Sequence, residues 1–215
     1  MNYEIVSKEI AENVYSGIFR KDGKTPYIHH PAAIIELLKS WGMNDEFANS
    51  IAWLHDAIEE NKVQINDRIT LFEYIKNYIE KNYPEENFNY DDLQKKIVDQ
   101  VDILTFYESD MPKIQMFEKM NFGKKFLKSK YLCEVVENAD FNGFIVKVAD
   151  RICNTREFVK SGSYGYAKKY LTRGEILFCH INYWAQFSVS TGNNERFEVL
   201  KKAAKEIESL ALEIK

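Results

Sequence analysis

Two histidines and two aspartates, in three separate segments, could together bind a divalent metal ion. His30 belongs to a His-His-Pro step, His55 and Asp56 are adjacent in WLHDAIEE, and Asp150 lies in VKVADRICN. Two imidazoles and two carboxylates suit Mn²⁺, Fe²⁺, Co²⁺ or Zn²⁺ better than Mg²⁺ or Ca²⁺, which prefer oxygen ligands. Four protein ligands on an octahedral ion leave two positions for a water and a substrate phosphate oxygen. Such a centre would lower the pKa of the water and polarise the phosphorus.

Each of these segments also has a plainer interpretation. The basic loop that begins at Arg20, with the histidines that follow it, could be a solvated surface loop. A histidine beside a carboxylate is often only a satisfied core residue, and Lys147 and Asp150 could form an ion pair on a solvated helix face. Against this, the acids at Glu59 and Glu60 lie next to an apolar stripe, and buried carboxylates are costly unless a cation compensates them. The segment FIVKVADRI is also too apolar for a helix with an exposed side.

Helical periodicity dominates the segments that carry these residues. From Asp45 to Glu60, apolar residues recur at i, i+4, i+7 and i+11, which predicts a helix with His55 on its buried stripe. The run AAIIELLKSW predicts a helix with Pro31 in its first turn and His30 at about its N-cap. TLFEYIKNYIEKNY and residues 195–215 predict further helices, and residues 84–92 and 160–165 are expected to be loops.

The composition favours an all-α protein. Only 9 glycines and 4 prolines occur in 215 residues, which disfavours a many-turned β sandwich or barrel. We expect a single domain over residues 1–215 with roughly seven to ten helices of ordinary length. Its motif-bearing core would span about residues 20–156, followed by C-terminal helices over residues 164–215.

Charge and cysteine content limit the classes of partner and compartment. The 33 acids and 29 bases give a net charge of −4, so we expect no broad nucleic-acid surface, although a local basic pocket could hold a phosphorylated small molecule. The three cysteines have an odd count and no CxxC spacing, which fits reduced thiols. No secretory signal and no membrane-length apolar run are visible, so the expected location is cytoplasmic.

The motifs PYIHHPAAII, WLHDAIEE and VKVADRICN, in this order, resemble those of the HD-domain metal-dependent phosphohydrolases. More narrowly, they resemble the (p)ppGpp hydrolase domain of the RelA/SpoT family. The resemblance covers about Arg20 to Arg156, although residues 61–140 share only general helical character. It implies an HD-domain helical bundle of the small, hydrolase-only type, because 215 residues leave no room for synthetase and regulatory domains.

The resemblance also implies a role for each matching residue. Two acids, Glu59 and Glu60, match the pair that positions or activates the attacking water. The remaining matches are metal ligands for a typically manganese ion (His30, His55, Asp56 and Asp150) and substrate-binding residues (Arg20, Lys21 and Asn154).

The function that the resemblance implies is a manganese-dependent guanosine-3′,5′-bis(diphosphate) 3′-pyrophosphohydrolase. In such an enzyme, metal-activated water attacks the 3′-diphosphate of ppGpp or pppGpp. Departures at Tyr15-Ser16-Gly17-Ile18, Glu60 and Glu157 leave open another substrate, such as a nucleoside monophosphate, a dinucleotide or NADPH. A third alternative is a non-catalytic module that binds a nucleotide or a protein partner.

Overall fold

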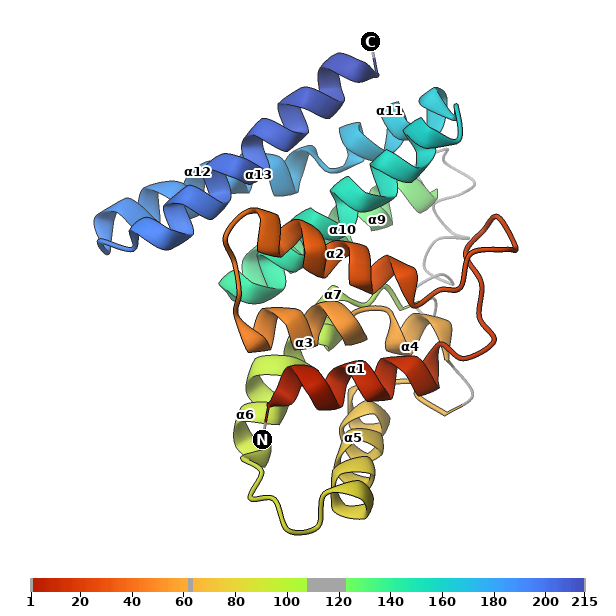
Figure 1. Cartoon of the computed structure of the whole chain (residues 1–215). Helices are drawn as coiled ribbons and strands as arrows, with labels where there is room; N and C mark the ends of the chain where they lie inside the picture. The colour runs from red at the N-terminus through yellow and green to blue at the C-terminus, as the bar shows by residue number, and fades with distance from the viewer. Residues whose placement is uncertain (1, 62–63, 108–122, 215) are drawn as a thin grey trace. The chain divides into compact units, whose positions relative to one another are not determined.

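The computed structural model describes residues 2–61, 64–107 and 123–214 (Figure 1). In these ranges the regular structure is helical, and the β pairing is limited to an isolated antiparallel bridge between Phe19 and Pro26. The predicted all-α class is therefore confirmed. The chain divides into two compact units, residues 1–39 with 44–105 and residues 40–43 with 106–215. The expected single domain over residues 1–215 stays a prediction.

The first unit contains the N-terminal helices of the described residues. They are α1 (Tyr3–Val14), α2 (His29–Ser40, ending in the second unit), α3 (Glu46–Leu54), α4 (Ala57–Glu60), α5 (Arg68–Asn82), α6 (Tyr90–Asp92), the π-helix η1 (Leu93–Val98) and α7 (Asp99–Leu104). Helices α1 and α3 lie side by side (Figure 1). Asp45 caps α3, because its carboxylate accepts hydrogen bonds from the backbone N–H groups of Phe47 and Ala48, both at 2.9 Å.

The helix predicted over residues 45–60 is interrupted where the candidate ligands lie. Helix α3 ends at Leu54 and α4 begins at Ala57, with φ −107° and ψ 8° at Asp56 between them. The prediction of one continuous helix is wrong, although Ile51 and Ile58 are buried as their spacing predicts. The apolar stripe continues across the interruption, so the periodicity gave no sign of it.

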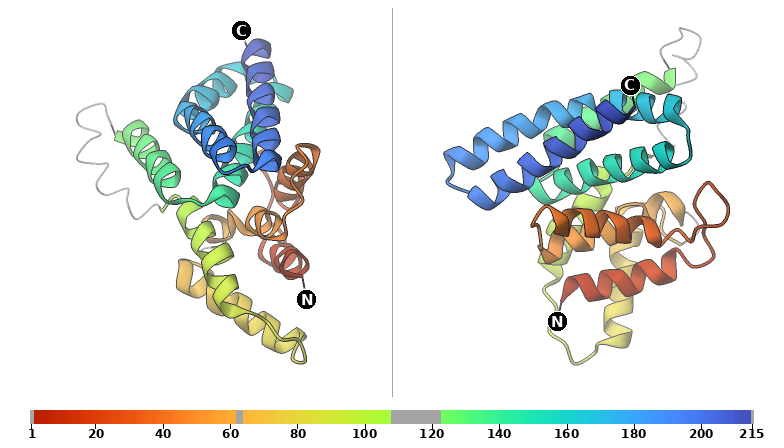
Figure 2. Two further views of the ribbon diagram at one scale, coloured as in Figure 1. Left: turned by 90° about the vertical axis from the view of Figure 1, so that its left-hand side faces the viewer. Right: turned by 45° about the horizontal axis from the view of Figure 1, so that its top comes forward.

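The second unit contains the C-terminal helices of the described residues. They are α9 (Gly123–Asn138), α10 (Phe141–Lys160), α11 (Tyr164–Arg173), α12 (Glu175–Ser190) and α13 (Asn194–Glu213). Helices α12 and α13 pack along each other (Figure 2). Helix α10 is the central element of this unit, because most of its residues from Phe141 to Cys153 are buried. The predicted loop at residues 160–165 shortens to the turn 161–163, in which Gly162 has φ +69°.

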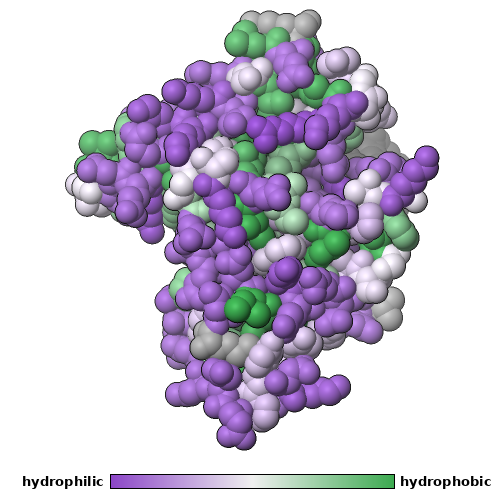
Figure 3. Space-filling model, in the orientation of Figure 1, coloured by the Kyte–Doolittle hydropathy of each residue, from purple (hydrophilic) through white to green (hydrophobic). Residues whose placement is uncertain are grey.

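One face of the molecule is mainly polar. Figure 3 shows one face of the molecule, on which hydrophilic residues cover most of the area between small hydrophobic patches. No helix among the described residues is both long enough and apolar enough to cross a bilayer.

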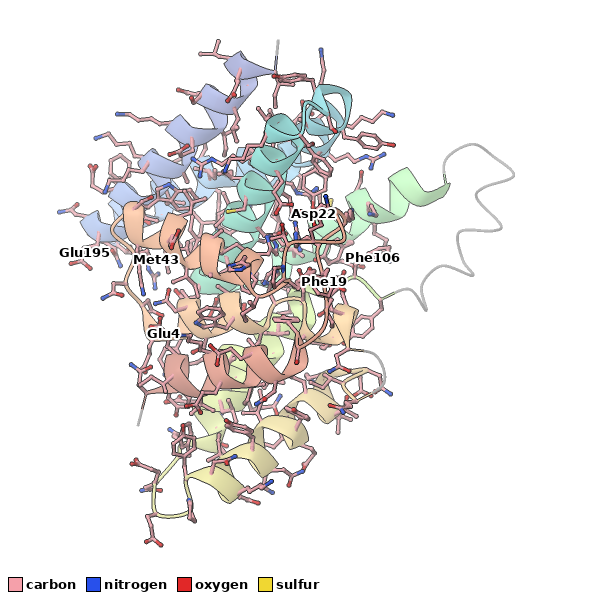
Figure 4. All side chains as sticks on the ribbon, turned by 45° about the vertical axis from the view of Figure 1, so that its right-hand side comes forward. Glu4, Phe19, Asp22, Met43, Phe106 and Glu195 are labelled. Carbon is pink, nitrogen blue, oxygen red and sulfur yellow. The ribbon has the colours of Figure 1, made fainter. Side chains whose placement is uncertain are left out.

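The basic loop that leads into α2 has its own hydrogen-bonded structure. The backbone N–H of Arg20 donates to the carbonyl of Thr25 at 2.8 Å, and Gly23 takes φ +68° at the turn. Asp22, labelled with Phe19 in Figure 4, accepts hydrogen bonds from the Thr25 hydroxyl at 2.6 Å and from the N–H groups of Lys24 and Thr25. These bonds, with the Thr25 hydroxyl first, lower the pKa of Asp22 to about 2. The loop that carries Arg20 and Lys21 is thus ordered by its one acid.

We expect Asp22 to stay ionised at pH values where an ordinary aspartate is already protonated. Because its folded pKa is lowered, its contribution to loop order is complete above the unfolded value of 3.8 and is lost as the pH falls through about 2. NMR titration of the carboxyl carbon from pH 5 downward checks this, with the Lys24 and Thr25 amide signals moving together with it. A midpoint near the unfolded value would contradict the loop structure.

Candidate metal centre

Three of the four predicted ligands converge in the first unit. One ligand atom from each of His30, His55 and Asp56 lies within 4.8 Å of the others. His30, predicted at about the N-cap, is instead the second residue of α2, while His55 and Asp56 occupy the interruption between α3 and α4. The exposed fraction is 3% for His30 and 0% for His55. The neighbouring His29 is exposed, so the structure distinguishes the two histidines of the His-His-Pro step.

The distances between these atoms fit a shared divalent ion. Oδ2 of Asp56 lies 2.9 Å from Nε2 of His55 and 3.9 Å from Nε2 of His30. Two ligand atoms, each about 2.1 Å from an ion, lie about 3.0 Å apart at a right angle and about 4.2 Å apart when opposite each other. Both measured separations are close to this span.

The hydrogen bond at the far side of His55 fixes which ring nitrogen can bind a metal. Nδ1 lies 2.8 Å from the carbonyl oxygen of Ala52, which only accepts, so Nδ1 carries a proton in this bond. In a neutral imidazole Nε2 then has the lone pair, and it faces the carboxylate of Asp56. The contact between Nε2 of His55 and Oδ2 of Asp56 therefore needs one of two things. Either the two atoms share a proton, which would make a buried imidazolium, or both atoms bind a cation. A divalent ion satisfies both, so the residues present fit a metal site.

The interruption of the helix is what allows adjacent residues to converge. In a continuous helix, neighbouring side chains point in different directions and do not face each other. Because the chain leaves the helical conformation at Asp56, its carboxylate turns back toward the imidazole of His55. The departure from helical geometry thus creates the paired ligands that the His-Asp sequence suggested.

The two acids beyond Asp56 lie on α4, close to the cluster. Glu59 is half-buried and Glu60 is exposed. Burial, then the charge of Asp56, raises the pKa of Tyr15, and the carboxylates of Glu60 and Glu59 raise it further. Tyr15 is buried and its ring centre lies 5.1 Å from that of Tyr27. The negative charge of α4 therefore raises the pKa of the tyrosines beside the candidate metal site.

Tyr27 connects the basic loop to the cluster, a contact that the sequence did not predict. Its hydroxyl donates to Oδ2 of Asp56 at 2.5 Å, and burial, followed by the charge of Asp56, raises its pKa. The guanidinium of Arg20 lies 5.2 Å from the centre of the Tyr27 ring. Lys21 is exposed on the same loop. The sequence shows a tyrosine three residues before His30, but it does not show that this tyrosine contacts Asp56, 29 positions away.

Asp150 and Asn154 lie on α10 in the second unit. Oδ2 of Asp150 is 3.3 Å from Nζ of Lys147, and the amide of Asn154 donates to Oδ1. Lys147 and Asp150 are both buried, which agrees with the prediction that this helix has no freely exposed side there. A buried carboxylate is thus compensated within its own helix. The assignments of Asp150 as fourth ligand and Asn154 as a nucleotide contact stay predictions.

Substituting Asp150 tests the fourth ligand directly. If its carboxylate binds the ion, Asp150→Asn should weaken Mn²⁺ affinity roughly tenfold or more, since even outer partners of metal ligands contribute at this scale. Isothermal titration calorimetry measures the affinity. Lys147→Met is the matched control, because it removes the ion-pair partner and leaves the carboxylate in place. An unchanged affinity in Asp150→Asn would leave a centre of three protein ligands.

The observed cluster is a group of two imidazoles and one carboxylate that could hold a metal ion. Catalytic metal sites often combine three protein ligands of this kind with open positions for water or substrate. The identity of the ion is not fixed by these three side chains alone, because several divalent transition ions accept them. Compared with known proteins, the chain matches no family model and no curated protein.

Proposed function

We propose that this protein is a metal-dependent phosphohydrolase whose substrate is a phosphorylated nucleotide, namely ppGpp or pppGpp, and whose ion is Mn²⁺. The observation that carries the proposal is the buried cluster of His30, His55 and Asp56, whose ligand atoms meet within 4.8 Å. Two further carboxylates and a cationic loop adjoin this cluster. A core histidine that serves packing alone has no need of these neighbours.

The chain's own residues supply a proton acceptor beside the cluster. When bound, the ion would lower the pKa of a water molecule and polarise a phosphate oxygen. Glu59 is half-buried on α4, three residues beyond Asp56, and would orient this water and take its proton. Glu60 is more exposed and would support the same task from the rim of the site.

The basic loop would offset the charge of a phosphorylated substrate. Residues 20–24 contain three cations and one acid in a chain whose net charge is −4. The acid, Asp22, is engaged with the backbone of its own loop. Arg20 lies against the ring of Tyr27, whose hydroxyl contacts the Asp56 ligand. Cations at this place would stabilise a diphosphate as negative charge develops on it.

The proposed reaction needs water alone as co-substrate. The water oxygen forms a bond to the phosphorus attached to the ribose 3′ oxygen, and the bond between that phosphorus and the 3′ oxygen breaks. The 3′ oxygen takes up a proton and leaves as a hydroxyl group. The products are pyrophosphate and GDP, or GTP when the substrate is pppGpp.

Incubation of the purified protein with Mn²⁺ and ppGpp tests the proposal, with the products separated by ion-exchange chromatography. We expect GDP and pyrophosphate in equal amounts, and none after chelation of the metal. Release of phosphate from a nucleoside monophosphate, a dinucleotide or NADPH, with ppGpp unchanged, would identify that compound as the substrate. A tightly bound but unchanged nucleotide would indicate a binding module, and both outcomes would overturn the ppGpp assignment.

A further inference from the structure

Tyr27 makes the shortest of the contacts described at the metal cluster. Its hydroxyl donates to Oδ2 of Asp56 at 2.5 Å, and this oxygen also faces Nε2 of both His55 and His30. A hydrogen bond from a hydroxyl to a carboxylate is charge-assisted, and such bonds are short and strong. The oxygen at which the candidate ligands converge is therefore the one that Tyr27 holds.

The ring of Tyr27 is itself held from several directions. It lies edge-on to the ring of His30, with 5.9 Å between their centres, and it contacts Tyr15 and the guanidinium of Arg20. Its backbone N–H donates to the carbonyl of Ile18 at 2.9 Å, and its carbonyl accepts from the N–H of His30 at 2.9 Å. A residue fixed at both backbone and ring places its hydroxyl with little freedom.

Asp56 needs such a partner because it lies outside a regular helix. It occupies the N-cap position of α4 but makes no side-chain capping bond to that helix, so the helix end does not orient its carboxylate. Partners of this kind orient ligand side chains, and their loss typically costs about 10- to 100-fold in metal affinity.

We propose that Tyr27 is a positioning residue of the metal centre, which holds the Asp56 carboxylate toward the two imidazoles and thereby sets the affinity for the ion. This inference rests on the proposed metal centre. Tyr27 acts through Asp56 and through its contact with Arg20, so it also fixes the basic loop at a constant place beside the ligands.

Metal titration of Tyr27→Phe tests this role, with Mn²⁺ alone as the probe. The substitution keeps the ring and removes the hydroxyl, and we expect about 10- to 100-fold weaker binding by calorimetry, with an unchanged far-ultraviolet spectrum. Tyr83→Phe is the matched control. The Tyr83 hydroxyl also donates to a carboxylate, that of Glu9, at 2.5 Å and in the same unit. This control should bind Mn²⁺ as the unsubstituted protein does.

The outcomes separate this inference from the proposed function. Equal Mn²⁺ affinity in Tyr27→Phe and the unsubstituted protein would overturn the role of Tyr27 and leave the centre intact. Absence of Mn²⁺ binding by the unsubstituted protein would overturn the centre itself. If Tyr27→Phe fails to fold, the unsubstituted protein with ring-labelled tyrosine decides. Addition of Zn²⁺ should shift the NMR signal of the Tyr27 ring carbon that carries the hydroxyl, and the corresponding Tyr83 signal should not move. If the histidine signals shift and the Tyr27 signal does not, the inference is refuted.

Discussion

Asp56→Ala is expected to remove the bound metal ion and, with it, all nucleotide hydrolysis. Asp56 supplies the one carboxylate among the three clustered residues, and its Oδ2 lies 2.9 Å and 3.9 Å from the two imidazole nitrogens. Without it, the two imidazoles remain, and no carboxylate among the three clustered residues offsets the charge of a dication. The loss of affinity should therefore exceed the roughly 10- to 100-fold caused by removing an outer partner. Metal content after dialysis, measured by plasma mass spectrometry, checks the result together with ppGpp turnover.

Two adjacent histidines provide the matched control for the ligand series. His30 is buried in the cluster and His29 is exposed, although they are neighbours in the first turn of α2. His30→Ala should lose the metal as Asp56→Ala does, whereas His29→Ala should retain both metal and turnover. Stoichiometric metal in purified Asp56→Ala, or equal effects of the two histidine substitutions, would refute the three-residue centre.

The helices could be predicted from the sequence wherever an apolar stripe repeats at helical spacing. The predicted helix over residues 195–215 corresponds to α13, and the helix predicted over TLFEYIKNYIEKNY corresponds to α5. In both, apolar residues at helical spacing are buried, such as Ile75 and Ile79 in α5 and Val199 and Ala203 in α13. These elements need no information beyond their own residues.

The interruption at Asp56 could not be predicted in this way. Ile51, Leu54 and Ile58 keep the spacing of one helix across it, and no glycine or proline marks the place. At the interruption the Asp56 carboxylate meets His55 and the hydroxyl of Tyr27, which lies 29 positions earlier in the chain, and the local pattern contains no information about that contact. The motif thus indicated residues that the structure does bring together, but the continuous helix predicted through them was wrong.

Contacts between residues far apart in the sequence are the other feature that could not be predicted from the sequence. His30, His55 and Asp56 were predicted as ligands because their types suit one ion, and the structure brings them together. Tyr27 was not predicted because no sequence spacing indicates which residue a tyrosine hydroxyl contacts. Asp150 was predicted from a third motif, and it has partners in Lys147 and Asn154 on its own helix. A carboxylate that contacts side chains of its own helix can also bind a metal ion. The Asp150→Asn titration therefore decides whether Asp150 is a ligand.

Glu59→Gln is expected to retain the metal and lose most of the turnover. Glutamine has nearly the same shape as glutamate but cannot take a proton from water, and Glu59 is not among the three clustered ligands. Removal of a general base typically lowers kcat about 100- to 10,000-fold, and we expect a loss in this range with KM for ppGpp little changed. Steady-state kinetics and Mn²⁺ calorimetry on the same preparation measure the two properties separately.

Two further glutamine variants show whether the effect belongs to the position or to the charge. Glu60→Gln removes a more exposed carboxylate from the same short helix, and Glu36→Gln removes an exposed one from α2. If Glu59 takes the proton, its variant should be the slowest, Glu60→Gln intermediate and Glu36→Gln unaffected. Equal losses at positions 59 and 60 would indicate that their summed negative charge matters, because a single base acts at one position. A fully active Glu59→Gln protein would remove Glu59 from the mechanism and leave the orientation of the water to Glu60.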